Sequence, residues 1–260
     1  MRKVLCLFLL LTGFGLNAQE YQLSKPLVKI EGDQFFEKRT SIRCEFRLKG
    51  ASIHYTLDGK EPTSSSPRYR GPIKVKWAKT IKVKAFKEGF IPSETVVHQV
   101  FRVKEKPAFV KLSPEPKPPY DAQMSETLTN LKAGSFNFRD GEWIGYNEGP
   151  VTIDVDLGRP MGKTFVTLST LVSPGSWIMN PDRITVAFSN DGISWEGQKE
   201  LKVEPVEEGD AALKQFYEVL IGRAYRYTRF VVYPIASLPD WHPGKGNAGW
   251  VFIDEVFIQE

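Results

Sequence analysis

Two stretches of the chain combine tryptophan with polar side chains that can exchange hydrogen bonds. An indole plane can cover the apolar C–H face of a sugar ring, while carboxylate, amide and imidazole groups bond the hydroxyl rim. The first stretch holds Trp177 and Asn180, and the second holds Asp240, Trp241, His242 and Asn247. These residues are our candidates for a carbohydrate-binding site.

The evidence for catalytic residues is weaker than that for a sugar-binding site. Asp154 and Asp156 lie two apart on one expected strand face, and a carboxylate pair could hydrolyse glycosides. The solvated face of a sheet makes a poor cleft, however, so we favour a structural role. His54, His98 and His242 with the lone Cys44 offer no zinc-ligand spacing, and the sequence has no Gly-x-Ser-x-Gly nucleophile motif. We therefore expect that the protein is not an enzyme.

The first residues have the composition of a secretory signal peptide. A basic start precedes an apolar run to Leu16, and Ala18 suits cleavage. Residues 1–18 are therefore assigned to a signal peptide, and the mature protein is expected to be secreted, periplasmic or at the cell surface. The apolar run is shorter than the ~20 residues of a membrane span. We expect no membrane span, and no nucleic-acid partner because the chain is exported.

The elements that must position the candidates are β-strands. Ile53, Tyr55 and Leu57 alternate with polar residues, and residues 151–157 repeat this period of two, which predicts half-buried antiparallel strands. We expect an all-β protein, with a small immunoglobulin- or fibronectin-III-like sandwich followed by a larger jelly-roll β-sandwich. Cys44 lies on the apolar face of one such strand and is expected to be buried.

Proline and charge divide the chain into two parts. Five prolines between residues 107 and 119 predict a semi-rigid linker. Residues 21–106 hold 19 Lys and Arg against 9 Asp and Glu, whereas residues 107–260 hold 14 against 21. Opposite charges indicate separately folded units, so the expected parts are residues 21–104, a linker at 105–119, and residues 120–260.

Four lysines could form a binding face in the first part. They are Lys74, Lys76, Lys82 and Lys84, which would line one sheet face if their two strands pair. Such a face could bind a polyanion. It could also be a solvated face whose charges prevent edge-to-edge aggregation, and we favour this second interpretation.

Three motifs in the first part resemble a known family. They are IHYTLDGKEP at residues 53–62, SPRYRGPI at 66–73 and TIKVKAFKEGFIPS at 80–93. Together they resemble the chitobiase/β-hexosaminidase C-terminal domain, a fibronectin-III-associated β-sandwich, over most of residues 27–103. The resemblance implies a non-catalytic domain of the kind found beside the catalytic domains of secreted glycosidases.

The second part resembles another family. The motifs are DGEWIGY at residues 140–146, TIDVDLG at 152–158, SNDGISWE at 189–196, YTRFVVYP at 227–234 and WVFIDEVFI at 250–258. They resemble the discoidin, or coagulation-factor C-type, galactose-binding-like domain appended to secreted bacterial hexosaminidases and fucosidases. The resemblance implies sugar binding by loops at one end of the sandwich and a structural calcium. Asn130-Leu131 replaces the expected Asp-Gly, so we expect weak or absent calcium dependence, with Asp140 and Glu255 as candidate ligands.

Antiparallel alternation predicts where the sugar site lies. Connections near residues 147–150, 173–182, 204–214 and 234–249 should share one end of the second sandwich, and tight turns at 190–192 and 222–223 the other. Long loops on a rigid scaffold are typical of binding sites. Trp177 and Trp241 belong to that end, either in a site or closing the core. Four other tryptophans, Trp77, Trp143, Trp195 and Trp250, are expected in the cores.

These observations favour a secreted, non-catalytic carbohydrate-binding protein. One alternative is a structural or protein-docking module of a glycosidase system, whose partner would be a glycoside hydrolase. A second alternative is a glycosidase-like enzyme, related to β-N-acetylhexosaminidases or fucosidases, with a site between the domains.

Overall fold

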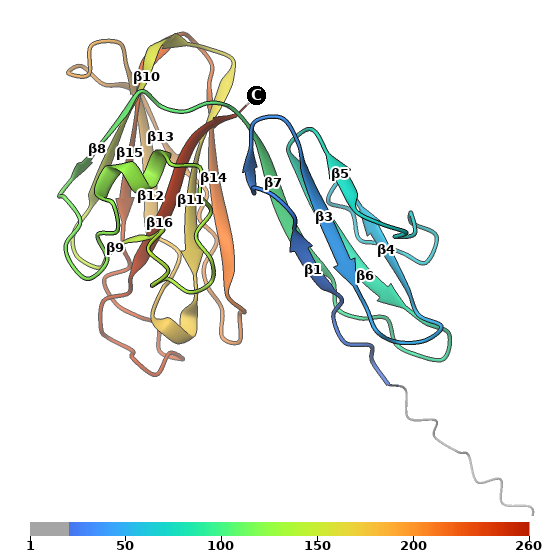
Figure 1. Ribbon diagram of the computed structural model, residues 1–260. Coiled ribbons are helices and arrows are strands. Elements are labelled where there is room, and N and C mark those ends of the chain that lie inside the picture. Colours follow the sequence, from blue (N-terminus) through green and yellow to red (C-terminus); the bar gives the residue numbers. More distant parts are fainter. Residues whose placement is uncertain (1–20, 260) are drawn as a thin grey trace, which may run out of the picture.

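The computed structural model describes residues 21–259, so the signal peptide expected at residues 1–18 lies outside the described residues. Over this range the regular secondary structure is β-strand apart from two short 3₁₀ helices, which confirms the all-β prediction. Two sandwiches stand side by side (Figure 1). Within residues 21–259, no helix is long and apolar enough to cross a membrane.

The first sandwich packs one three-stranded sheet, β1-β3-β5, against strands β4, β6 and β7. Its core contains Ile42, Ile81 and Val83, which are fully buried. Cys44 is also buried there, as predicted, and burial raises the pKa of its thiol to about 12, which makes it unreactive. The strands are β1 (Leu27–Ile30), β2 (Phe35–Phe36), β3 (Thr40–Glu45), β4 (Ser52–Thr56), β5 (Ile73–Val75), β6 (Lys79–Phe86) and β7 (Val96–Glu105).

The second sandwich packs the sheet β13-β12-β15-β10-β8 against β14, β11 and β16, with β9 paired to β16. Alternate residues of these strands are buried because they meet in the layer between the two sheets. The elements are β8 (Phe109–Ser113), η1 (Met124–Thr129), β9 (Ile144–Tyr146), β10 (Val151–Met161), β11 (Thr164–Val172), η2 (Pro174–Ser176), β12 (Arg183–Ser189), β13 (Glu196–Leu201), β14 (Leu213–Ile221), β15 (Tyr225–Tyr233) and β16 (Val251–Gln259).

The linker prediction for residues 105–119 needs a correction. Residues 109–113 form β8, which pairs antiparallel with β10 from Phe109↔Asp156 to Ser113↔Thr152. Val110 and Leu112 enter the core, with 2% and 6% exposure. The linker was predicted from the prolines on either side of β8. The five residues of β8 contain no proline and show the period of two that is typical of a strand.

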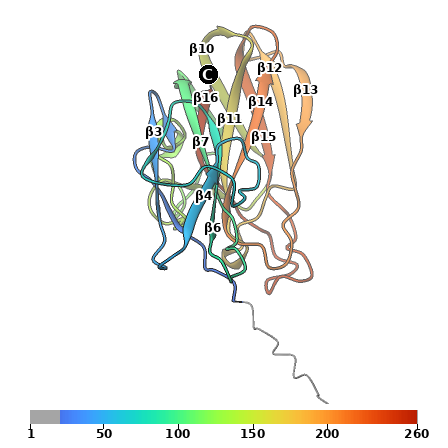
Figure 2. The ribbon, with the colours of Figure 1, turned by 90° about the vertical axis from the view of Figure 1, so that its right-hand side faces the viewer.

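The two sandwiches are joined by paired backbone and by aromatic packing. β7 pairs with the end of β16 through Ile258↔Glu105 and Gln259↔Val103, so one sheet runs β14-β11-β16-β7-β6-β4 through both sandwiches (Figures 1 and 2). At this junction lie four rings whose centroids are 4.5 to 6.3 Å apart, from Phe35, Phe101, Phe216 and Phe257. This contact orders the sandwiches relative to each other.

The tryptophans divide differently from the prediction. Trp143 is core, with 1% exposure. Trp77 is not, because β5 ends at Val75 and the side chain, 56% exposed, lies under the Arg102 guanidinium. Trp195 precedes β13 and is half-buried beneath the Arg229 guanidinium, 3.9 Å from the ring centroid. Both tryptophans lie just outside a strand, where the alternation of apolar and polar residues no longer predicts burial.

Candidate functional site

The long connections of the second sandwich meet at one end, as the alternation predicted. Ile178 forms bridges with both Ser173 and Trp250, and the Asn180 amide donates to the Glu204 carbonyl at 2.9 Å. η2 and the connection between β15 and β16 lie at the lower end of this sandwich in Figure 1. We call this the loop end. The tight turns at residues 190–192 and 222–223 lie close to each other, since the Asn190 amide donates to the Ala224 carbonyl.

Trp177 is held in a fixed position at the loop end. It terminates η2 in the left-handed region with φ of +65°, and its N–H donates to the Pro174 carbonyl at 2.8 Å. Its ring lies against Gly244, where an added Cβ would come within 2.6 Å of the indole. The side chain nevertheless stays 39% exposed. The loop end therefore presents a pre-positioned aromatic plane.

His242 supports this plane from inside. The Gly244 N–H donates to His242 Nδ1 at 2.9 Å, so Nε2 carries the hydrogen and donates to the Pro174 carbonyl at 2.8 Å. The imidazole centroid is 5.9 Å from that of Trp177 and 5.6 Å from that of Trp241. Both ring nitrogens are engaged and 3% of the residue is exposed. The prediction that His242 contacts a sugar is therefore corrected: it positions the loop.

The other predicted residues fall into two groups. Asn180 accepts from the Tyr217 hydroxyl at 3.0 Å and donates to Glu204, so one N–H and one oxygen lone pair of its amide are used within the fold. Asn247 donates to the Gly244 carbonyl at 3.0 Å while remaining exposed. Asp240 is exposed and Trp241 half-buried. Sugar contacts by Asp240, Trp241 and Asn247 stay predictions.

Trp177 also lines a pocket that the sequence did not identify. The rings of Phe138, Trp250 and Phe252 surround Tyr120, with centroid distances of 5.8, 5.0 and 4.9 Å. The pocket has a volume of about 270 Å³ and is lined by Tyr120, Phe138, Arg139, Ser176, Trp177, Trp250 and Phe252. We call it the aromatic pocket. Its walls come from four separate segments, so no local spacing could have grouped them.

The aromatic pocket combines stacking surfaces with hydrogen-bond donors. Its rings offer apolar planes, and the Arg139 guanidinium and Ser176 hydroxyl lie among the lining groups. Phe252 is 1% exposed, whereas Trp250 is half-buried, which places it in the pocket wall rather than in the core. This arrangement fits a ligand with an apolar face and polar substituents.

The carboxylates weighed as a catalytic pair are engaged in ion pairs. Asp154 accepts two hydrogen bonds from Arg229, at 2.5 and 2.8 Å, and Asp156 accepts two from Arg226, both at 2.9 Å. The Arg226 hydrogen bond lowers the pKa of Asp156. A cleft of about 510 Å³ does lie between the sandwiches, but the residues that line it include no Asp or Glu. It therefore lacks the paired carboxylates of a glycosidase.

The four lysines do not form one face. Lys74 lies on β5 and Lys82 and Lys84 on β6, and these strands belong to different sheets. Lys82 and Lys84 also share Glu61, with contacts of 3.8 and 2.8 Å. His54 on the neighbouring strand β4 is 8% exposed and bonds to Ser52 and the Ser66 carbonyl. Both interpretations assumed that the two strands pair, and that shared face is not formed.

The calcium implied by resemblance finds a poor set of side chains. Both Asp140 oxygens accept backbone N–H groups, from Ser135 at 2.6 Å and Glu142 at 3.0 Å. Within residues 21–259, His, Cys, Asp and Glu form no group of three that could hold a metal. These residues therefore do not fit the implied site, and weak or absent calcium dependence stays a prediction.

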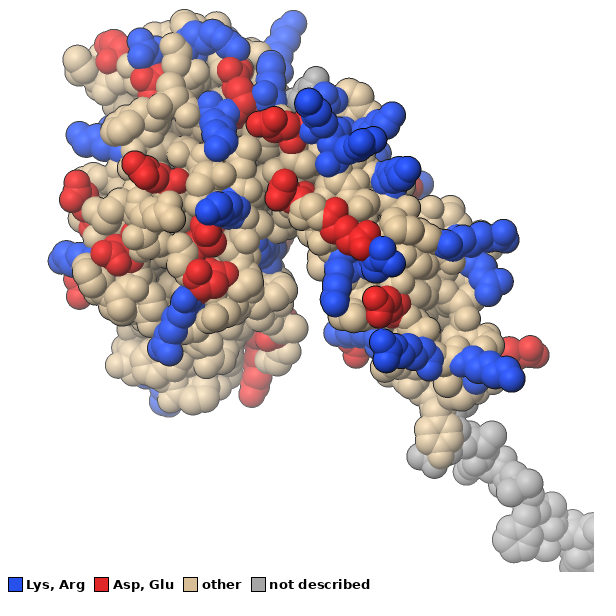
Figure 3. Space-filling model, viewed as in Figure 1, with Lys and Arg blue, Asp and Glu red and all other residues tan. Residues whose placement is uncertain are grey.

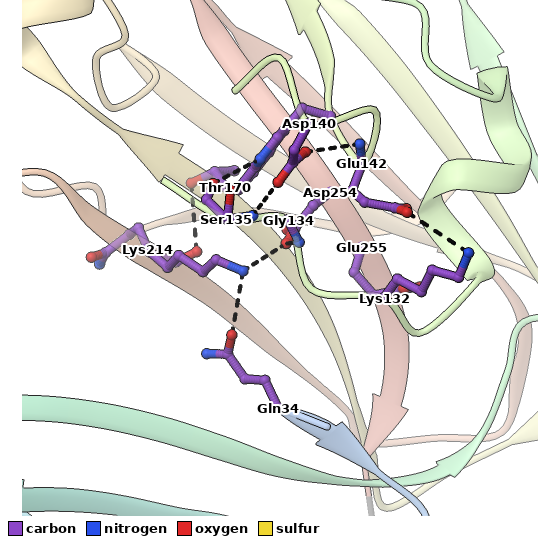
Figure 4. Close-up of polar contacts among 12 residues, drawn as sticks. Gln34, Lys132, Gly134, Ser135, Asp140, Glu142, Thr170, Lys214, Asp254 and Glu255 are labelled. Atoms are coloured by element: carbon purple, nitrogen blue, oxygen red, sulfur yellow. Dashed lines mark hydrogen bonds and ion pairs between the residues drawn. The ribbon is translucent and has the colours of Figure 1, made fainter. Parts of the chain in front are cut away.

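Glu255 and Asp254 instead form a buried polar cluster (Figure 4). Glu255 accepts from the Leu131 N–H at 2.6 Å, and burial, together with the neighbouring Asp254 charge, raises its pKa to about 9. Asp254 accepts from Lys214 Nζ and from the Gly134 N–H, each at 3.0 Å. The Lys214 ammonium thus balances the buried Asp254 carboxylate, so the positive charge beside it comes from a side chain of the protein.

Comparison with known proteins gives a family match for the first sandwich. Residues 32–98 match the family model of the Chitobiase/beta-hexosaminidase C-terminal domain, which confirms the resemblance of the first sandwich. No curated protein matches the chain.

Three solved structures illustrate what the fold is similar to. A SusE-like protein shares 17% identity and a TM-score of 0.36, over 89% of this chain and 96% of that one. The C-terminal domain of a chitobiase from Bacteroides fragilis shares 18% identity and a TM-score of 0.34, over 59% of this chain and 95% of that one. A Clostridium perfringens CBM32 module, in complex with glcNAc-alpha-1,4-galactose, shares 11% identity and a TM-score of 0.36, over 60% of this chain and 91% of that one.

Proposed function

We propose that this chain is a non-catalytic carbohydrate-binding protein that holds a sugar in the aromatic pocket. The observation that carries the proposal is Trp177, an exposed indole fixed beside the rings of Tyr120, Phe138 and Trp250 in a pocket of about 270 Å³. A pyranose ring presents an apolar C–H face that such a plane can cover. Because Gly244 and His242 already hold the indole, little side-chain entropy remains to be lost on binding.

The first sandwich supports a role in glycan metabolism. The family that matches residues 32–98 is named after chitobiase and β-hexosaminidase, which favours an accessory of a glycoside hydrolase. With the signal peptide expected at residues 1–18, we place the mature protein outside the cytoplasm, secreted, periplasmic or at the cell surface. A docking module would use the same loops to contact a protein instead.

The test compares two exposed tryptophans. Trp177→Ala removes the pocket plane, and Trp77→Ala removes an indole of the first sandwich that is 56% exposed and remote from the pocket. A glycan array on the wild-type protein selects the ligand, and calorimetric titration then measures each variant. Loss of an aromatic binding anchor costs about 1–3 kcal/mol, roughly a fivefold to hundredfold weaker Kd. Thermal melts verify that both variants stay folded.

We expect Trp177→Ala to bind the glycan more weakly by that factor at unchanged Tm, and Trp77→Ala to bind as the wild type does. Equal affinity for both variants would place the ligand elsewhere. A wild-type protein that gives no array signal would favour the docking module.

A further inference from the structure

We propose that the aromatic pocket selects acidic sugars, in which a carboxylate or sulfate group accompanies the apolar ring face. This inference rests on the proposed function and names the ligand class of the same site. The residue that carries it is Arg139, which supplies the positive charge among the lining groups of the pocket.

Arg139 is exposed and its charge is not neutralised by the surrounding protein. The turn that presents it is fixed, since its backbone N–H donates to Asn137 Oδ1 at 3.2 Å. The guanidinium lies 5.2 Å from the Phe138 ring centroid, a cation–π contact that orients it in the pocket wall. Among residues 21–259, none of the ion pairs involves Arg139. An unpaired, oriented guanidinium is suited to bidentate recognition of an anion.

The acidic residues nearest in sequence are held by other groups. Asp140 accepts the Ser135 and Glu142 N–H groups, and Glu142 accepts from the Asn130 amide at 2.8 Å and lies 3.8 Å from Lys132 (Figure 4). On the face shown in Figure 3, the lower end of the second sandwich carries mainly uncharged side chains. Neither of these carboxylates forms an ion pair with Arg139.

The hydrogen-bonding groups of the pocket are also biased toward donors. The polar side chains of its lining are one guanidinium, the indole N–H groups of Trp177 and Trp250, and the hydroxyls of Tyr120 and Ser176. Carboxylates and side-chain amides, the usual acceptors for neutral hydroxyl rims, are missing from the lining residues. Such a donor-rich surface favours a ligand rich in acceptors, as an acidic sugar is.

The experiment titrates the full mature chain with paired sugars. The probes are galacturonic acid and galactose 6-sulfate, each against galactose, and glucuronic acid against glucose, at low and high salt. The variants are Arg139→Gln, Arg139→Lys and Trp177→Ala, with Arg70→Gln as the matched control, because it removes the same charge from an exposed position of the first sandwich.

We expect at least one acidic probe to bind tenfold or more tightly than its neutral partner, with a preference that weakens in high salt. Arg139→Gln should abolish the preference, Arg139→Lys should retain part of it, and Arg70→Gln should leave it unchanged. The carboxylate and sulfate arms distinguish uronic acids from sulfated sugars. Equal binding of acidic and neutral probes that still requires Trp177 overturns this inference alone, as does a preference that survives Arg139→Gln. Binding that is indifferent to Trp177→Ala overturns the proposed function as well.

Discussion

Replacing Lys214 with methionine should expose the energetic role of the buried cluster at the junction of the sandwiches. Lys214 Nζ lies 3.0 Å from Asp254 Oδ2 and 3.3 Å from Gln34 Oε1, so one ammonium serves both sandwiches (Figure 4). The side chains of Lys214 and Asp254 are 10% and 0% exposed. Both side chains are therefore largely shielded from water.

The magnitude follows from what remains around Asp254. Its Oδ2 keeps the Gly134 N–H at 3.0 Å, while its Oδ1 has no hydrogen-bond partner among the described residues. Removing one member of a buried ion pair leaves an uncompensated charge and costs about 3–5 kcal/mol, whereas a surface pair contributes about 0–1 kcal/mol. We expect Lys214→Met to lower the free energy of unfolding by an amount in the first range.

Urea denaturation followed by tryptophan fluorescence measures the loss. The double variant Lys214→Met/Asp254→Asn removes both charges and keeps an oxygen for the Gly134 N–H, so it should recover most of the stability. Lys25→Met is the matched surface control, since Lys25 and Glu94 are 54% and 64% exposed in their pair. A loss below about 1 kcal/mol for Lys214→Met, or a double variant no more stable than the single one, would refute the reasoning.

Three further outcomes are expected. The pKa of Glu255 is raised from 4.5 to about 9 in the folded state, so its contribution to stability is present at acidic pH and is lost as the pH rises between these values. Urea unfolding between pH 5 and 9 should therefore show a steeper fall for the wild type than for Glu255→Gln, and equal slopes would mean an ionised Glu255. Limited proteolysis should spare residues 105–113, because β8 is paired along its length; two fragments separated there would contradict that pairing. Calcium should not raise the Tm, and a large rise reversed by a chelator would require a site that the side chains do not form.

Much of the architecture could be predicted from local patterns. The period of two in residues 151–157 produced a strand because one face is buried and the other is partly exposed. Residues 53–56 also form a strand, although His54 on its polar face is buried as well. Antiparallel alternation was sufficient to bring residues 173–182 and 234–249 to one end, since successive strands reverse direction. Trp177 was found in this way, from its type and its place in a long loop.

Other features depended on how the sheets close. Tyr120, Phe138 and Trp250 meet Trp177 because β9, β11 and β16 bring together segments that are far apart in the chain. His242 turns inward because the Pro174 carbonyl and the Gly244 N–H offer partners there, which no spacing within residues 240–247 reveals. The order of apolar and polar side chains in the sequence was sufficient to predict the strands, and the order of the strands was sufficient to predict the loop end. Which aromatic rings line a pocket, and which polar groups are already satisfied, is decided by contacts between distant segments in the tertiary structure.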